Sequence, residues 1–191
     1  SAQGLAVESS AEEWQVQGKN LMQRSMFHLA AKCFRKSGDV RSENEAIAQH
    51  LIRHVAPPLL GNAPQLVEVY LEAAERFMAA GNNELSVARC CYSAGVQAGK
   101  EGDVKRSRAF YDVAGSVFSW LARADIGNDL FLRRAIGCLR KAGSISAAVE
   151  LLVARGRHSQ ALKLLRDERL WSQALLFLDS HHAEFAPEQL T

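Results

Sequence analysis

The chain has 191 residues, 48% of them hydrophobic, and its 23 basic and 21 acidic residues leave a formal net charge of +2. A chain of this size and composition can bury one continuous core or one repeat array, so we expect one structural unit. No apolar run exceeds about five residues, whereas a transmembrane helix needs roughly 20, so we expect a soluble protein without a membrane partner.

The start of the sequence carries no secretory signal, because Ser-Ala-Gln-Gly is not a basic segment followed by an apolar stretch. The first residue is not Met, which indicates a fragment of a larger protein. The four cysteines lack C-x-x-C spacing and include the vicinal pair Cys90 and Cys91, so we expect reduced thiols, with Cys33 and Cys138 filling the core. These features predict an intracellular protein, cytoplasmic or nuclear.

Capping patterns mark the first helices. Residues 1–10 are predicted to form a flexible N-terminus, and Ser10 with Glu13 fits a capping box that begins a helix at about residue 11. Ser42 with Glu45 fits a second capping box, followed by apolar residues at helical spacing. The sequence therefore predicts helices on both sides of the segment 30–38.

The middle of the chain contains the main predicted break. Residues 56–64 include three prolines and are predicted to form the longest loop and the only internal hinge. Apolar residues then recur every three or four positions over 66–80 and over 104–121, as expected of amphipathic helices. Further predicted N-caps are Asp103, Asp129 and Ser144. Predicted helix ends are Gly38, Gly81, Gly95 or Gly99, Gly127, Gly143 and Gly156.

Two segments are alike at a spacing typical of helical repeats. Residues 30–38 and 135–143 share Ala, Cys, an Arg-Lys pair and a final Gly at matching places, 105 residues apart. This offset is about three units of 35 residues, close to the period of a tetratricopeptide repeat (TPR), and residues 88–95 form a weaker copy between them. No segment alternates with the two-residue period of a strand.

The first repeat also fits the TPR consensus. Its tryptophan, glycine, tyrosine, alanine and phenylalanine positions hold Trp14, Gly18, Leu21, Ala30 and Phe34. The pattern departs from the consensus at Gln17 and Ser37. Small residues matter here because two helices approach closely only where side chains are small. The structural signature of the repeats is Trp14, Gly18, Ala30, Phe34, Ala135 and Cys138.

Beyond Gly143 the repeats become shorter. Three similar segments start at Ser146, Ser159 and Ser172, 13 residues apart. Each is long enough for one short helix and too short to fold alone, so the three must stack to bury their leucine faces. The sequence thus predicts an all-α fold, a TPR-like right-handed α-solenoid of about ten short antiparallel helices. Within a single 1–191 domain we expect TPR-like hairpins over 11–143, the 13-residue repeats over 144–182 and a tail over 183–191.

The unit around Trp14, the segment 30–38 and the run of Ala-x-x-Cys-aromatic units to about residue 178 resemble a known family. It is the TPR-like helical region that follows the UvrD-like helicase module in very large proteins, among them the TPR and ankyrin repeat-containing protein and its fungal relatives. The resemblance covers most of the chain. It implies a non-catalytic accessory region beside a nucleoside triphosphate-dependent motor, although these residues contain no helicase motif.

Catalytic patterns are incomplete. Residues 95–100 hold two glycines and a lysine, but three residues separate the glycines where a P-loop has four, and Glu101 follows the lysine. His50 and His54 have the four-residue spacing of helical metal ligands, without a third ligand nearby in sequence. No Ser, His and acid arrangement is recognisable. We therefore expect no enzyme activity, cofactor, metal or small-molecule substrate.

Basic residues concentrate in one segment. Residues 96–170 contain 14 Lys and Arg against 8 Asp and Glu, while the rest of the chain is slightly acidic. Such a segment could neutralise phosphates; alternatively, its cations face solvent and complement helix C-termini. Candidate nucleic-acid contacts are Lys105, Arg106, Arg108, Arg133, Arg134, Arg140, Lys141, Arg155, Arg157 and Arg166.

Two function classes remain. The favoured one is a non-catalytic protein–protein interaction or intramolecular scaffold module, whose partner is another protein or an adjacent domain of the parent chain. The alternative is a nucleic-acid-binding accessory domain that uses the basic segment 96–170. Candidate docking residues are Gln15, Lys19, Gln23, Glu45 and Gln49. Apolar residues that the last helices could expose are Leu164, Leu165, Leu175, Leu178 and Phe185.

Overall fold

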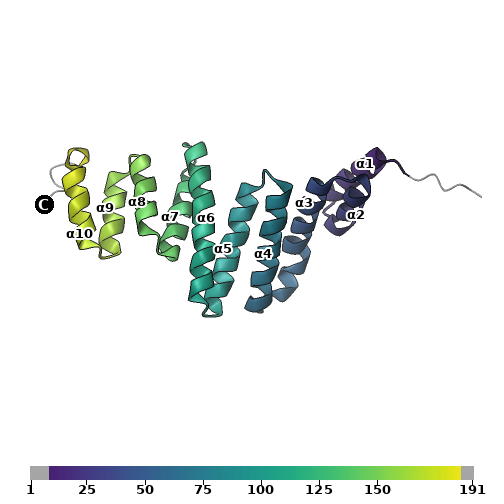
Figure 1. The fold of residues 1–191 in the computed structure, drawn as a ribbon, viewed down its shortest axis with the longest axis horizontal. Helices are drawn as coiled ribbons and strands as arrows, with labels where there is room; N and C mark the ends of the chain where they lie inside the picture. The colour runs from purple at the N-terminus through teal and green to yellow at the C-terminus, as the bar shows by residue number, and fades with distance from the viewer. Residues whose placement is uncertain (1–8, 186–191) are drawn as a thin grey trace, which may run out of the picture. The chain divides into compact units, whose positions relative to one another are not determined.

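The computed structural model describes residues 9–185, and all regular structure in that range is helical (Figure 1). The described residues form ten α-helices with short π and 3-10 turns, and they form no strand, so the predicted all-α class is confirmed. No helix within this range is long and apolar enough to cross a bilayer. Of the predicted flexible N-terminus and tail, residues 1–8 and 186–191 lie outside the described residues.

The chain divides into two compact units, Ser1–Asp103 and Val104–Thr191. The first unit contains α1 (Ala11–Gln23), α2 (Phe27–Ser37), α3 (Val40–His50), a π turn (Leu51–Val55), a 3-10 turn (Pro57–Leu59), α4 (Ala63–Ala80) and α5 (Glu84–Lys100). The second contains α6 (Val104–Ala124), α7 (Asp129–Ala142), α8 (Ile145–Ala154), α9 (His158–Asp167), α10 (Trp171–Ser180) and a 3-10 turn (His182–Glu184). Within each unit, every helix packs against the next helix in sequence.

Side-chain caps begin the first helices. The predicted capping box of α1 is confirmed, since the Glu13 N–H donates to Ser10 Oγ at 3.2 Å and the Ser10 N–H donates to Glu13 Oε2 at 3.0 Å. The predicted capping box at Ser42 is wrong, because α3 begins at Val40 and Asp39 is its N-cap. The Ser42 N–H and hydroxyl donate to Asp39 at 3.1 and 2.7 Å, and these bonds lower the pKa of the Asp39 carboxyl.

Glycines end some of the helices where the sequence predicts it. Gly38 and Gly143 adopt left-handed backbone with φ of +77° and +83° and cap the C-termini of α2 and α7. The prediction that Gly95 or Gly99 ends a helix is wrong, because α5 includes both and continues to Lys100.

The N-caps predicted for the second unit need adjustment. Asn128, rather than Asp129, caps α7, since its Oδ1 accepts the Leu130 N–H at 3.1 Å. Ser144 does stand at the N-cap position of α8, but its hydroxyl donates to Asp112 Oδ1 at 2.6 Å, so it joins two helices instead of capping its own.

The proline-rich residues 56–64 form helical turns rather than an open loop. The Ala56 N–H donates to the Leu51 carbonyl at 2.8 Å, which closes the π turn, and a 3-10 turn follows at Pro57–Leu59. Pro64 then lies in the first turn of α4, where the missing N–H costs no hydrogen bond.

Glycines let the first two helices of each unit pack closely. A methyl group on Gly18 of α1 would lie 2.7 Å from the Phe34 ring of α2, and one on Gly115 of α6 would lie 2.9 Å from Leu139 Cδ2 of α7. Phe34 and Leu139 hold the same position in the repeated segments 30–38 and 135–143. The two units therefore use the same packing device at the matching residue of the repeat.

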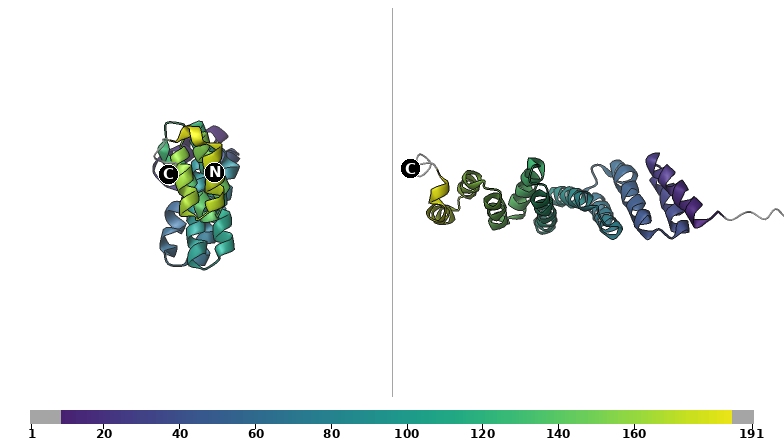
Figure 2. Two further views of the ribbon diagram at one scale, coloured as in Figure 1. Left: turned by 90° about the vertical axis from the view of Figure 1, so that its left-hand side faces the viewer. Right: turned by 90° about the horizontal axis from the view of Figure 1, so that it is seen from above.

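The three short repeats of the second unit form consecutive short helices. The helices α8, α9 and α10 start at Ile145, His158 and Trp171, 13 residues apart, and each packs on the next (Figures 1 and 2). Their alanines Ala148, Ala161 and Ala174 share one buried cluster with leucines of α8 and α9 and with Phe177 and Phe185.

The two kinds of glycine on α6 and α7 predict stability changes of opposite sign. Gly115→Ala should lower the free energy of unfolding by about 1–2 kcal/mol, because the new methyl group overlaps buried Leu139 and outweighs the gain in helix propensity. Gly137→Ala should raise it by about 0.5–1 kcal/mol, because a methyl group there meets no atom within 4 Å. Urea unfolding followed by circular dichroism measures both. Equal effects of the two substitutions would contradict the close approach at Gly115.

Candidate protein-docking groove

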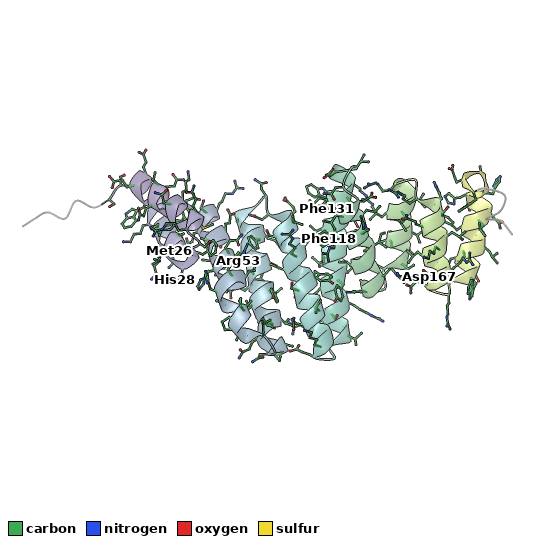
Figure 3. All side chains as sticks on the ribbon, turned by 180° about the vertical axis from the view of Figure 1, so that it is seen from behind. Met26, His28, Arg53, Phe118, Phe131 and Asp167 are labelled. Atoms are coloured by element: carbon green, nitrogen blue, oxygen red, sulfur yellow. The ribbon has the colours of Figure 1, made fainter. Side chains whose placement is uncertain are left out.

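The second unit contains a groove of about 560 Å³ between α7, α8 and α9. Its lining residues recur every three or four positions along α7 and α9, so one face of each helix forms a wall. The groove is lined by Asp129, Leu132, Arg133, Ile136, Gly137, Arg140, Leu152, Arg157, Gln160, Lys163, Leu164 and Asp167. Figure 3 labels Asp167 near the end of α9, on one of these walls.

Two ion pairs hold the walls of the groove together at its ends. Arg157, just before α9, donates to the Asp129 carboxylate at the start of α7, at 3.2 Å to each oxygen. At the other end, Arg140 Nη2 lies 2.8 Å from Glu168 Oε1, directly after α9. The start of α9 therefore lies beside the start of α7, and its end beside the end of α7. Between these pairs the groove runs along α7 from Asp129 to Arg140, which is eleven steps of the helix or about 16 Å.

The floor of the groove is apolar and open at one point. Leu132 of α7, Leu152 of α8 and Leu164 of α9 are buried beneath it. Gly137 faces the groove, and a methyl group at this position would touch nothing within 4 Å. A glycine inside a helix costs about 1 kcal/mol relative to alanine, and no packing contact requires one here. The missing side chain leaves space for an incoming group next to the apolar floor.

The charges of the groove fall into two groups. Arg140 and Arg157 are neutralised by the ion pairs at the two ends. Arg133 on α7 and Lys163 on α9 form no ion pair among residues 9–185, and neither does Asp167. The groove therefore offers two uncompensated cations, one on each wall, against one uncompensated carboxylate.

Arg155 must be removed from the predicted nucleic-acid contacts. Its side chain is only 9% exposed. Its guanidinium donates to the carbonyls of Ala122, at 2.7 Å, and Ile126, and lies 3.7 Å from Asp129. The Ala122 carbonyl belongs to the last turn of α6, where helical partners are lacking, and the Ile126 carbonyl to the turn after that helix. Arg155 therefore ties α8 to the end of α6 and to the turn after it, and its buried guanidinium is poorly accessible to a phosphate.

The other predicted basic contacts are dispersed. Arg133, Arg140 and Arg157 come together in the groove, whereas Lys105 and Arg108 are exposed on the first turns of α6 and do not line it. Arg106 lies over the Phe110 ring at 5.7 Å, and Lys141 over the Tyr111 ring at 4.9 Å. Arg134 and Arg166 are exposed outside the groove lining.

Three histidines cluster in the first unit. The His50 ring lies 5.3 Å from the His28 ring and 5.5 Å from the His54 ring, between centroids. His28 comes from α2 (Figure 3), so the sequence spacing of His50 and His54 gave no sign of it. No group of three or more His, Cys, Asp or Glu side chains in the described part of the chain is placed to hold a metal ion. His50 Nδ1 is buried without a hydrogen-bond partner in the same range.

The cysteines and the repeat signature lie in the cores of the units. All four cysteines are buried free thiols, and burial raises the pKa of Cys90 to about 12 and that of Cys138 to about 11, so both stay protonated at neutral pH. The signature residues Gly18, Ala30, Phe34, Ala135 and Cys138 are buried, while Trp14 is half-buried with the Lys36 ammonium 4.2 Å above its ring. The glycines and lysine of residues 95–100 lie within α5, not in a phosphate-binding loop.

The residues predicted to form a docking surface in the first half of the chain differ in their exposure to solvent. Lys19 and Gln23 are exposed on α1, whereas Glu45 and Gln49 on α3 are half-buried. The Gln15 amide donates to Asp39 Oδ2 at 3.3 Å and so helps to hold α1 near the start of α3. Among the apolar residues of the last helices, Leu164, Leu165 and Phe185 are buried, Leu178 is half-buried and Leu175 is exposed.

The histidine cluster predicts a loss of stability in acid. Burial, followed by the neighbouring His28 and His54, lowers the pKa of His50 below its usual value in the folded chain. The unfolded chain then binds the proton more readily, so the stabilisation present above about pH 6.5 is lost as the pH falls through the lowered pKa. Urea unfolding at about pH 7.5 and about pH 5 should show a smaller difference for His50→Gln than for the wild type.

The matched control is His182→Gln, which removes an exposed histidine of the second unit. This variant should keep the pH dependence of the wild type. If His50→Gln and His182→Gln show the same pH dependence, the half-buried ring of His50 does not set the acid sensitivity.

Comparison with known proteins gives no family assignment. The sequence matches no protein-family model and no curated protein. The resemblance to the helicase-associated TPR-like region therefore stays a prediction from the sequence, and function has to be inferred from the surfaces of the two units.

Proposed function

We propose that the chain is a non-catalytic protein-docking module, built as a TPR-like right-handed α-solenoid of short antiparallel helices. The observation that carries the proposal is the groove of α7, α8 and α9, whose apolar floor is open at Gly137 between charged walls. Its occupant is a segment of another protein or of an adjacent domain of the parent chain. From the sequence we further propose an intracellular setting, cytoplasmic or nuclear, beside a helicase module.

The dimensions of the groove define the occupant. An extended segment rises about 3.3 Å per residue, so a groove about 16 Å long accepts about five residues. The open point at Gly137 takes an apolar side chain, which is removed from water against buried Leu132 and Leu164. Arg133 and Lys163 then favour an acidic residue in the same segment, because their charges are not neutralised within the described range.

The same charges disfavour a nucleic acid in this groove. Asp129 and Asp167 line it, and Glu168 pairs with Arg140 at its end, so a chain of phosphates along the groove would meet carboxylates as well as cations. The alternative of a nucleic-acid-binding accessory domain rests on exposed basic residues elsewhere, such as Lys105 and Arg108 on α6. These two residues therefore serve as the comparison in the experiment.

The proposal is tested by selecting binders from a random peptide library displayed on phage, with the whole 191-residue chain as the target. We expect selected peptides to share an apolar and an acidic residue within about five positions. Affinity, measured by fluorescence anisotropy, should fall at least about tenfold for Arg133→Glu combined with Lys163→Glu, and for Gly137→Leu, which fills the open point. The control Lys105→Glu with Arg108→Glu should bind as the wild type does.

Two results would overturn the docking proposal. One is the selection of peptides that bind the wild type and the groove variants equally. The other is a failure to select any peptide while the chain binds a single-stranded oligonucleotide and loses that binding in the Lys105→Glu, Arg108→Glu variant. The second result would establish the nucleic-acid alternative.

A further inference from the structure

The last helix of the second unit carries an exposed apolar face. Trp171, Leu175 and Leu176 of α10 are 58%, 64% and 67% exposed. Trp171 and Leu175 are four residues apart and therefore lie on the same side of the helix. This face is separate from the groove, since no residue of α10 lines it.

Comparison with the preceding repeats shows that the exposed face of α10 corresponds to a face that is buried in α9. Leu175 stands at the fifth position of its helix, where α9 has Leu162 and α8 has Val149. Leu162 is only 6% exposed and belongs to a cluster that includes Ala174 and Phe177 of α10, whereas Leu175 is 64% exposed. The helix α9 packs against helices on both sides, while α10 packs mainly on α9. Within residues 9–185, the position that is covered in α9 is thus left uncovered in α10.

The exposed face of α10 carries one hydrogen-bond donor and one acceptor, so two copies of this face can pair with each other. Trp171 lies four residues before Leu175, and Asp179 lies four residues after it, on the same side of α10. When two α10 helices cross antiparallel at Leu175, each Trp171 lies opposite the partner's Asp179. The indole N–H is a donor and the carboxylate an acceptor, so the pairing forms twice. Neither side chain has a hydrogen-bond or ion-pair partner among residues 9–185.

We infer that the chain forms a two-fold symmetric homodimer through α10. Leu175 lies on the symmetry axis against its own copy, and Leu176 widens the apolar contact. Each Trp171 donates to the partner's Asp179 at either end of the contact. A second copy fits better than an unrelated helix because the donor and the acceptor lie at equal distances from Leu175, as an interface between identical surfaces requires. This inference does not depend on the function proposed for the groove.

Sedimentation equilibrium of the whole chain over a range of micromolar concentrations tests the inference. We expect a monomer–dimer equilibrium whose dissociation constant rises at least about tenfold in Leu175→Glu, because two carboxylates then meet at the axis. The matched control is Leu130→Glu, which changes a leucine of α7 that is 52% exposed and should leave dimerisation unchanged. Circular dichroism confirms that both variants fold.

A cross-link tests the symmetry of the contact. Leu175→Cys should give a disulfide-linked dimer under mild oxidation, because residue 175 of each copy lies on the axis, and Leu130→Cys should not. The four native cysteines are buried and leave little background. A monomer at all concentrations, dimerisation of Leu175→Glu equal to that of the wild type, or equal cross-linking of the two cysteine variants would each overturn the inference. A monomeric chain would leave this face to a helix of a different protein.

Discussion

A helix packs closely on its neighbour only where side chains leave room, and one glycine makes that room at the start of each unit. Gly18 faces the Phe34 ring and Gly115 faces Leu139, with no space for even one methyl group at either contact. Tight packing of this kind fixes the position of α7 against α6. Because Ala135, Cys138 and Leu139 are buried, the opposite face of α7 is turned to the groove. The candidate site thus depends on a glycine contact on the other side of the same helix.

Some arginines of the second unit bind other groups of the chain and stabilise the fold, whereas others are left to contact a ligand. Arg155 donates to the Ala122 carbonyl of α6 and to the Ile126 carbonyl just after it, and Arg140 and Arg157 join α7 to α9. Arg133 and Lys163 are left on the two walls of the groove without a neutralising carboxylate from the part of the chain that the structure describes. Formal charge along the sequence therefore overstates the positive surface that a phosphate would meet. A short apolar and acidic segment suits the remaining charges better.

The helical class was predictable because the apolar period, the Ser10 capping box and the glycines at 38 and 143 are local signals. The 13-residue repeat was also predictable, since similar short patterns recur with a constant offset. The ion pairs that bound the groove were not, because each joins residues 28 positions apart in sequence. The role of Arg155 and the position of His28 beside His50 likewise depend on tertiary packing. The capping prediction at Ser42 failed because Asp39 accepts the Ser42 N–H, which the predicted capping box assigned to the Glu45 side chain.

Docking in the groove of the second unit is the central claim, and hydrogen exchange measured by mass spectrometry tests it most directly. The chain would be compared alone and saturated with a peptide selected against it. The account predicts slower amide exchange in α7 and α9, where the walls of the groove lie, with little change in α1 to α5. Protection confined to the first turns of α6 or to the first unit, with α7 and α9 exchanging as in the free chain, would contradict it.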